Sequence, residues 1–109
     1  MNKKEFTLLL AYLPYAKNRL FTLDNAFLRG IRKKEDFLTY FYYYNLVKSF
    51  ESLIKQLPLD EKEILIFRYF DNKTLDEISV ILGYANHSSV QKKLNKIINT
   101  LWKLYSNKK

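Results

Sequence analysis

Turn-forming residues are scarce in this chain of 109 residues, which contains only two glycines and two prolines. A sheet protein needs many tight turns, and tight turns depend on glycine and proline. The scarcity therefore predicts an all-α chain with long helices and few breaks. Neither an internal repeat nor a low-complexity segment is found in the sequence, so neither alters this expectation.

The charge of the chain is strongly positive. Its 19 lysines and arginines exceed its 11 acidic residues, which gives a net charge of +8, while 48% hydrophobic residues suffice for a buried core. Such an excess favours a polyanionic partner, above all nucleic acid and less often an anionic membrane surface. A basic surface that serves solubility alone is the alternative.

Several classes of site are excluded by composition. The absence of cysteine excludes disulfides and thiolate metal sites. The single histidine, His87, has no suitably spaced carboxylates, so we expect no metal and no cofactor. No pairing of nucleophile and base and no glycine-rich phosphate loop is present, so we expect no enzyme. The apolar run Leu8–Leu13 is too short to span a membrane, and we expect a cytoplasmic protein with no membrane partner.

Three short helices are predicted before residue 30, at Lys4–Leu13, Tyr15–Phe21 and Asp24–Leu28. The first is expected to end before Pro14, because the residue before a proline is disfavoured in helical geometry. Asp24 is the expected N-cap of the third. Gly30 and the basic cluster Arg29–Lys34 then interrupt the helical pattern.

A longer helix is predicted over Lys34–Leu57. Its mostly apolar stripe has spacings of three and four, which outweigh the strand propensity of "YFYYYNLV". The stripe consists of Leu38, Phe41, Tyr42, Asn45, Leu46, Ser49, Phe50, Leu53, Ile54 and Leu57. Tyr40, Tyr43 and Tyr44 lie partly off this stripe. Their rings either cover neighbouring helices or form a surface for a partner or a second copy.

Two capping boxes follow Pro58. In each, an acceptor side chain precedes a glutamate by three residues: Asp60 with Glu63, and Thr74 with Glu77. The first predicts a helix to about Phe70. The second predicts a short helix that ends at Gly83, which can adopt the left-handed conformation of a C-cap.

The last helix is predicted from Asn86 or His87 to about Leu104. One face is apolar, with Val90, Leu94, Ile97 and Ile98, while the opposite face carries no acid and consists of Ser88, Ser89, Lys92, Asn95, Lys96 and Asn99. Leu101, Trp102 and Tyr105 are expected to anchor this helix to the N-terminal helices. A short helix followed by a helix of this kind is typical of a helix-turn-helix. The alternative is an ordinary helical hairpin with a solvated basic face.

The segment Leu57–Leu101 resembles region 4 of bacterial sigma factors and of related phage and mobile-element regulators. The resemblance rests on short motifs in a fixed order, which are Leu57-Pro58, Glu61 to Glu63, Arg68-Tyr69, Thr74-Leu75-Asp76-Glu77-Ile78, Leu82-Gly83 and Ser88-Ser89-Val90. It implies a DNA-binding domain of three or four helices that acts in transcription. The chain is accordingly expected to divide into a helical N-terminal segment, residues 1–57, and a helix-turn-helix domain, residues 58–109.

The expected DNA contacts fall into two sets. Bases would be read by Ser88, Ser89, Lys92, Asn95 and Lys96. Phosphates would be held by Lys73, His87, Gln91 and Lys93, with the Arg29–Lys34 cluster as a further candidate. The run Gly83–Val90 is one residue longer than the usual sigma pattern, which is expected to re-aim the recognition helix.

The leading functional hypothesis is a sequence-specific DNA-binding transcription regulator. Its expected partners are double-stranded DNA, RNA polymerase and, through the aromatic helix, a second copy of the chain. The N-terminal half does not resemble sigma region 2, so a complete sigma factor is not expected. The alternative is a protein- or RNA-binding accessory module that docks on RNA polymerase or is associated with the signal recognition particle. In the latter family the similar unit lies near the N-terminus, whereas here it is C-terminal.

Overall fold

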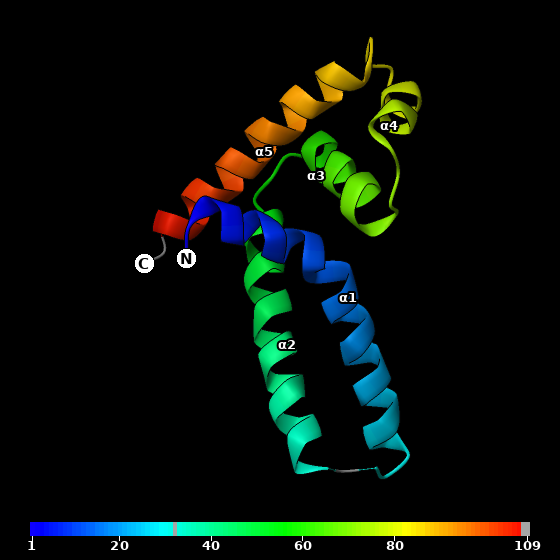
Figure 1. Cartoon of the computed structure of the whole chain (residues 1–109), viewed down its shortest axis with the longest axis vertical. Coiled ribbons are helices and arrows are strands. Elements are labelled where there is room, and N and C mark those ends of the chain that lie inside the picture. Colours follow the sequence, from blue (N-terminus) through cyan, green and yellow to red (C-terminus); the bar gives the residue numbers. More distant parts are fainter. Residues whose placement is uncertain (32, 108–109) are drawn as a thin grey trace.

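Every regular element that the computed structural model describes, in residues 1–31 and 33–107, is helical (Figure 1). The elements are α1 (Lys3–Leu28), α2 (Lys34–Ile54), α3 (Leu59–Leu65), the π-helical turn η1 (Ile66–Phe70), α4 (Leu75–Leu82) and α5 (His87–Asn107). The predicted all-α fold is confirmed. None of these helices is long and apolar enough to cross a membrane.

Helix α1 runs through Pro14 and replaces the three short helices expected from the sequence. Proline removes one helical hydrogen bond and bends the helix at a cost of about 3 kcal/mol, and Figure 1 shows α1 bent between its dark-blue and lighter-blue parts. Leu10 and Leu13 before the proline and Ala16 after it are all buried. This continuous burial offsets the cost. Asp24 therefore lies inside a helix, and its expected role as an N-cap is wrong.

Helix α2 pairs with the second half of α1 in a hairpin that projects from the rest of the molecule (Figure 1). The predicted helix over 34–57 is confirmed up to Ile54, and a turn then brings the buried Leu57 into the core.

The predicted stripe of α2 is wrong in the first half of the helix. Leu38, Phe41 and Tyr42 are exposed, whereas Tyr43 packs against the core and its hydroxyl lies 3.0 Å from that of Tyr12. Both faces are apolar in this half, so the periodicity alone allowed either face to be buried. Packing against α1 selects the face that contains Tyr43 and Val47.

The first of the two predicted capping boxes is also wrong. Pro58 occupies the N-cap position of α3, which places Asp60 inside the first turn, and no side chain caps this end. Asp60 and Glu61 still lie where the helix dipole favours acids. The helix continues as η1 to Phe70, the predicted end, where the Asp71 amide donates to the Ile66 carbonyl at 2.9 Å.

One core connects both halves of the chain. Phe6 of α1 is fully buried, with its ring centroid 5.0 Å from that of Phe50, 5.4 Å from Trp102 and 5.3 Å from Tyr105. These contacts confirm that Trp102 and Tyr105 anchor α5 to the N-terminal helices. The same core continues through residues such as Ile64 into α3, α4 and the first half of α5. The expected boundary at residue 57 falls in the turn after α2, and the two expected domains share this core.

Candidate nucleic-acid interface

A reciprocal pair of hydrogen bonds begins α4. The Thr74 hydroxyl accepts from the Glu77 amide at 3.1 Å, and the Glu77 carboxylate accepts from the Thr74 amide at 3.0 Å. The second predicted capping box is thus confirmed. The hydrogen bond from the Thr74 amide lowers the pKa of the Glu77 carboxyl most. The hydrogen bond with the Thr74 hydroxyl and the positive charge of Lys73 lower this pKa further. A lowered pKa means that Glu77 supports folding at neutral pH and loses this effect as the pH falls through its folded pKa.

We expect Thr74→Ala to reduce the free energy of unfolding by about 1 kcal/mol, because the free amides at the start of α4 lose their acceptor. Chemical denaturation measures the change. Thr22→Ala is the matched control, because Thr22 is an exposed threonine inside α1. Alanine favours a helix interior, so this control should be neutral or slightly stabilising. Equal destabilisation by the two variants would show that the Thr74 cap contributes nothing of its own.

The turn between α4 and α5 spans residues 83–86. Gly83 has a φ of 78°, the left-handed conformation that glycine adopts without strain, so its predicted role as a C-cap is confirmed. Tyr84 packs its ring against the core, and its amide donates to the Ser79 carbonyl at 2.8 Å. Gly83 and Tyr84, the first two residues of the turn, are therefore held in place.

Asn86 caps the start of α5. Its side-chain oxygen accepts from the Ser89 amide at 3.0 Å and lies 3.3 Å from the Ser89 hydroxyl. A helix start was predicted at Asn86 or His87, but no role was predicted for the Asn86 side chain. The available signal was that asparagine is among the best N-cap residues. Ser89 is half-buried and turned toward this cap, whereas Ser88 is exposed.

The two faces of α5 are as predicted except at Ser89, which is half-buried against Asn86. Val90, Leu94, Ile97 and Ile98 are buried in the core, and Ser88, Lys92, Asn95, Lys96 and Asn99 are exposed. Since the outer face carries no carboxylate, it can approach a phosphate backbone without repulsion. The first helical turns of α5 are exposed at the end of the molecule farthest from the α1–α2 connection (Figure 1).

Two amides on α5 are linked to each other. The Gln91 side-chain amide donates to the Asn95 oxygen at 2.8 Å. This bond leaves both N–H donors of the Asn95 amide and the Gln91 oxygen available to a ligand. The link holds Asn95 on the exposed face with its donors pointing away from Gln91.

Three of the expected phosphate-binding side chains lie close to groups of the protein itself. His87 Nδ1 lies 3.4 Å from Asp76 Oδ1, which joins the start of α5 to the start of α4. Lys93 Nζ lies 3.4 Å from Glu61 Oε2 in a partly buried pair that joins α5 to α3. Gln91 is linked to Asn95, as described above. Lys73 lies half-buried in the turn before α4, and its carbonyl accepts from Arg68 at 3.1 Å.

The further phosphate candidate, the Arg29–Lys34 cluster, lies at the connection between α1 and α2. Arg29, Lys33 and Lys34 are exposed, and Arg32 lies outside the described residues. This connection is at the opposite end of the molecule from the start of α5 (Figure 1). The structure therefore does not bring the cluster together with the exposed face of α5.

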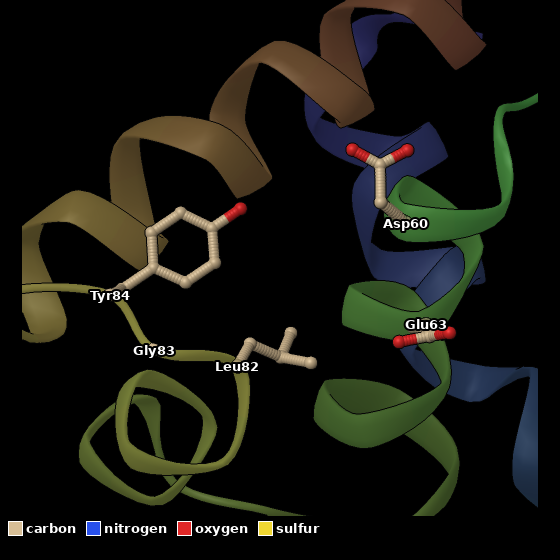
Figure 2. A pocket seen from close by; sticks show the side chains of 5 residues that line it. All are labelled: Asp60, Glu63, Leu82, Gly83 and Tyr84. Carbon is tan, nitrogen blue, oxygen red and sulfur yellow. The ribbon is translucent and has the colours of Figure 1, made fainter.

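A shallow pocket lies between α3 and the α4–α5 turn. Figure 2 shows Leu82 pointing toward α3, from which Asp60 and Glu63 project, with Tyr84 on the other side. The two carboxylates at its rim, those of Asp60 and Glu63, would repel a phosphate. No group of three or more acidic or histidine side chains within residues 1–31 and 33–107 could hold a metal ion.

Comparison with known protein families identifies the helix-turn-helix. Residues 48–96 match the family model of sigma-70, region 4. The match extends from the end of α2 through α3, η1 and α4 into α5. This part of the chain is therefore similar to sigma region 4, as the resemblance predicted, and domains of that family are DNA-binding and non-enzymatic. Neither the curated proteins nor the solved structures yielded a match.

Proposed function

We propose that this sigma region 4-like protein is a sequence-specific DNA-binding regulator of transcription, and that the first turns of α5 enter the major groove of duplex DNA. The observation that carries the proposal is the exposed face of α5, which is polar and basic, free of acids and backed by a buried apolar face. In helix-turn-helix proteins the N-terminal residues of the second helix read the bases.

The proposed base-reading set is Ser88, Ser89, Lys92, Asn95 and Lys96. Lys92 can donate to the acceptors of guanine, and the free donors of Asn95 can bond base acceptors in the major groove. Ser88 is exposed in the first turn of the helix, where its hydroxyl and the free amides suit a base edge or a phosphate. Ser89 already lies against Asn86, so its hydroxyl contributes less than that of Ser88.

The proposed phosphate-binding set is Lys73, His87, Gln91 and Lys93. The Nδ1 atom of His87 lies near Asp76, which leaves the Nε2 atom for a phosphate. Lys93 has to leave Glu61 before it can bind DNA, because the two are 3.4 Å apart in a partly buried pair. We therefore expect Lys93 to contribute less to the affinity for DNA than Lys92 and Lys96 do.

RNA polymerase is the proposed protein partner, because the domain matched here is a region of polymerase sigma factors. Together with DNA binding, this contact would place the chain at a promoter.

Selection from a pool of randomised duplexes tests the proposal. We expect several rounds of binding and amplification to enrich a common sequence of a few base pairs, because a helix of this size reads only a short stretch of groove. The matched control is the same selection with one triple variant that combines Lys92→Ala, Asn95→Ala and Lys96→Ala. A pool that stays random with the unaltered protein contradicts sequence-specific reading.

A further inference from the structure

The ion pair between Lys93 and Glu61 connects α5 to α3. The lysine side chain is 31% exposed and the glutamate side chain 20%, which makes this the least exposed ion pair within residues 1–31 and 33–107. At the start of the same helix, the side chains of His87 and Asp76 are 60% and 82% exposed. Water and salt screen an exposed pair strongly and a partly buried pair much less. Glu61 therefore holds its partner more strongly than Asp76 does.

Lys93 stands at the edge of the exposed face of α5. It follows Ser89 by four residues and precedes Lys96 by three, and residues at these spacings are neighbours on a helix. A lysine side chain is long and flexible and ends in a freely rotating ammonium, so it can reach either toward α3 or toward the exposed face. In the structure the ammonium lies against Glu61 of α3. The position of Lys93 on α5 therefore permits a phosphate contact that its ion pair opposes.

We infer that Glu61 is a positioning residue that keeps Lys93 away from the DNA backbone and thereby lowers the affinity of the protein for any duplex. This inference rests on the proposed function of α5. A phosphate oxygen and the Glu61 carboxylate are both charged acceptors, so they compete for the same ammonium. Phosphate contacts hold a protein on DNA but carry no direct sequence information. The ion pair therefore weakens binding to every duplex while it leaves the proposed base contacts in place.

The net charge of the chain gives this ion pair a role. A charge of +8 attracts the protein to duplex DNA of any sequence. Non-specific sites greatly outnumber specific ones, so protein that is held at them is lost to its target. A carboxylate that occupies one lysine of the proposed interface reduces this loss.

Among the acids of α3, which all lie within the described residues, Glu61 is the one paired with Lys93. Asp60 and Glu63 line the pocket between α3 and the α4–α5 turn, and Figure 2 shows both projecting from α3. Glu63→Gln removes the same charge from the same helix as Glu61→Gln. It therefore provides a matched control for the loss of charge alone.

Fluorescence anisotropy of a labelled mixed-sequence duplex tests the inference through a double-mutant cycle. We expect Glu61→Gln to tighten binding roughly 2- to 5-fold, the range for one ion pair. The salt dependence should steepen by about 0.9 unit of slope, because one more phosphate is neutralised. Glu63→Gln should tighten binding less and leave the slope unchanged. In a Lys93→Ala background, Glu61→Gln should act no more strongly than Glu63→Gln.

Glu61→Ala is the second variant, because alanine removes the carboxylate and is the best helix former. Circular dichroism should show an unchanged helix content for at least one of the two. Unchanged affinity and slope in both Glu61 variants overturn the inference, as does a gain above that of Glu63→Gln in the Lys93→Ala background. If Lys92→Ala weakens binding while the Glu61 variants have no effect, the role of Glu61 is wrong and the proposed function stands. A chain that binds no duplex at low salt overturns both.

Discussion

Replacing Phe6 by alanine is expected to lower the free energy of unfolding by about 3–5 kcal/mol, the range for a fully buried phenylalanine. The ring lies within 5.5 Å, centroid to centroid, of three aromatic rings, those of Phe50, Trp102 and Tyr105. The variant removes their shared neighbour and leaves a cavity between α1, α2 and α5. Denaturation with urea, followed by circular dichroism, measures the change.

Leu8→Ala is the matched control for this prediction. Leu8 lies two residues farther along α1 and is 63% exposed, so we expect its loss to change stability by less than about 0.5 kcal/mol. The unfolding of both variants should remain a single transition, because one core spans α1, α2 and α5. A small effect of Phe6→Ala, or a transition in which the helix-turn-helix unfolds separately, would contradict the shared core.

Replacing Lys92 by alanine is expected to weaken binding to the selected DNA site roughly 5- to 150-fold, the range for one good base contact. Lys92 is exposed on the face of α5 that carries Asn95 and Lys96. The loss should be smaller on an unrelated duplex, and the salt dependence should become shallower by about one unit of slope if Lys92 also neutralises a phosphate. Fluorescence anisotropy over a salt series measures both quantities.

Lys93→Ala removes the same charge one residue later and is the matched control. Lys93 lies beside Glu61 on the side of α5 that faces α3. We therefore expect a smaller loss of affinity than for Lys92→Ala. Equal losses would mean that only total charge matters and that the exposed face of α5 reads no bases.

The signals that predicted the helix-turn-helix correctly are local. The Thr74 hydroxyl and the Glu77 carboxylate form their hydrogen bonds within a segment of four residues. Gly83 adopts the left-handed backbone conformation that its position at the end of α4 requires. Such features depend little on the rest of the fold, so a single sequence suffices to find them. Asp60 shows the limit of this reasoning, because it has the correct spacing to Glu63 but Pro58 takes the N-cap position.

The N-terminal half was harder to predict because tertiary packing overrides local preference there. Pro14 should end a helix, yet burial of Leu10, Leu13 and Ala16 carries α1 through it. The apolar pattern of α2 allowed either of two faces to be inside, and only the position of α1 decided between them. Neither outcome can be read from a window of ten or twenty residues.

Part of the candidate site also depends on contacts between distant residues. Lys93 and Glu61 are 32 positions apart in the sequence, and His87 and Asp76 lie on two successive helices, so the proximity within each pair follows from the packing of α5 on α3 and α4. The spacing of residues on α5 predicted its exposed face correctly, because one helix has a fixed period. It could not show which lysines on the edge of that face would lie beside acids of other helices.

Binding of duplex DNA, compared with binding of a structured RNA, tests the central claim most directly. The measurement is fluorescence anisotropy of labelled mixed-sequence duplex and labelled RNA hairpin with the full chain, over a series of salt concentrations. We predict preference for the duplex, with affinity that falls steeply as salt rises because lysines of α5 displace counterions from phosphates. Preference for RNA, or no binding to either at low salt, would contradict the assignment of α5 as a DNA-reading helix.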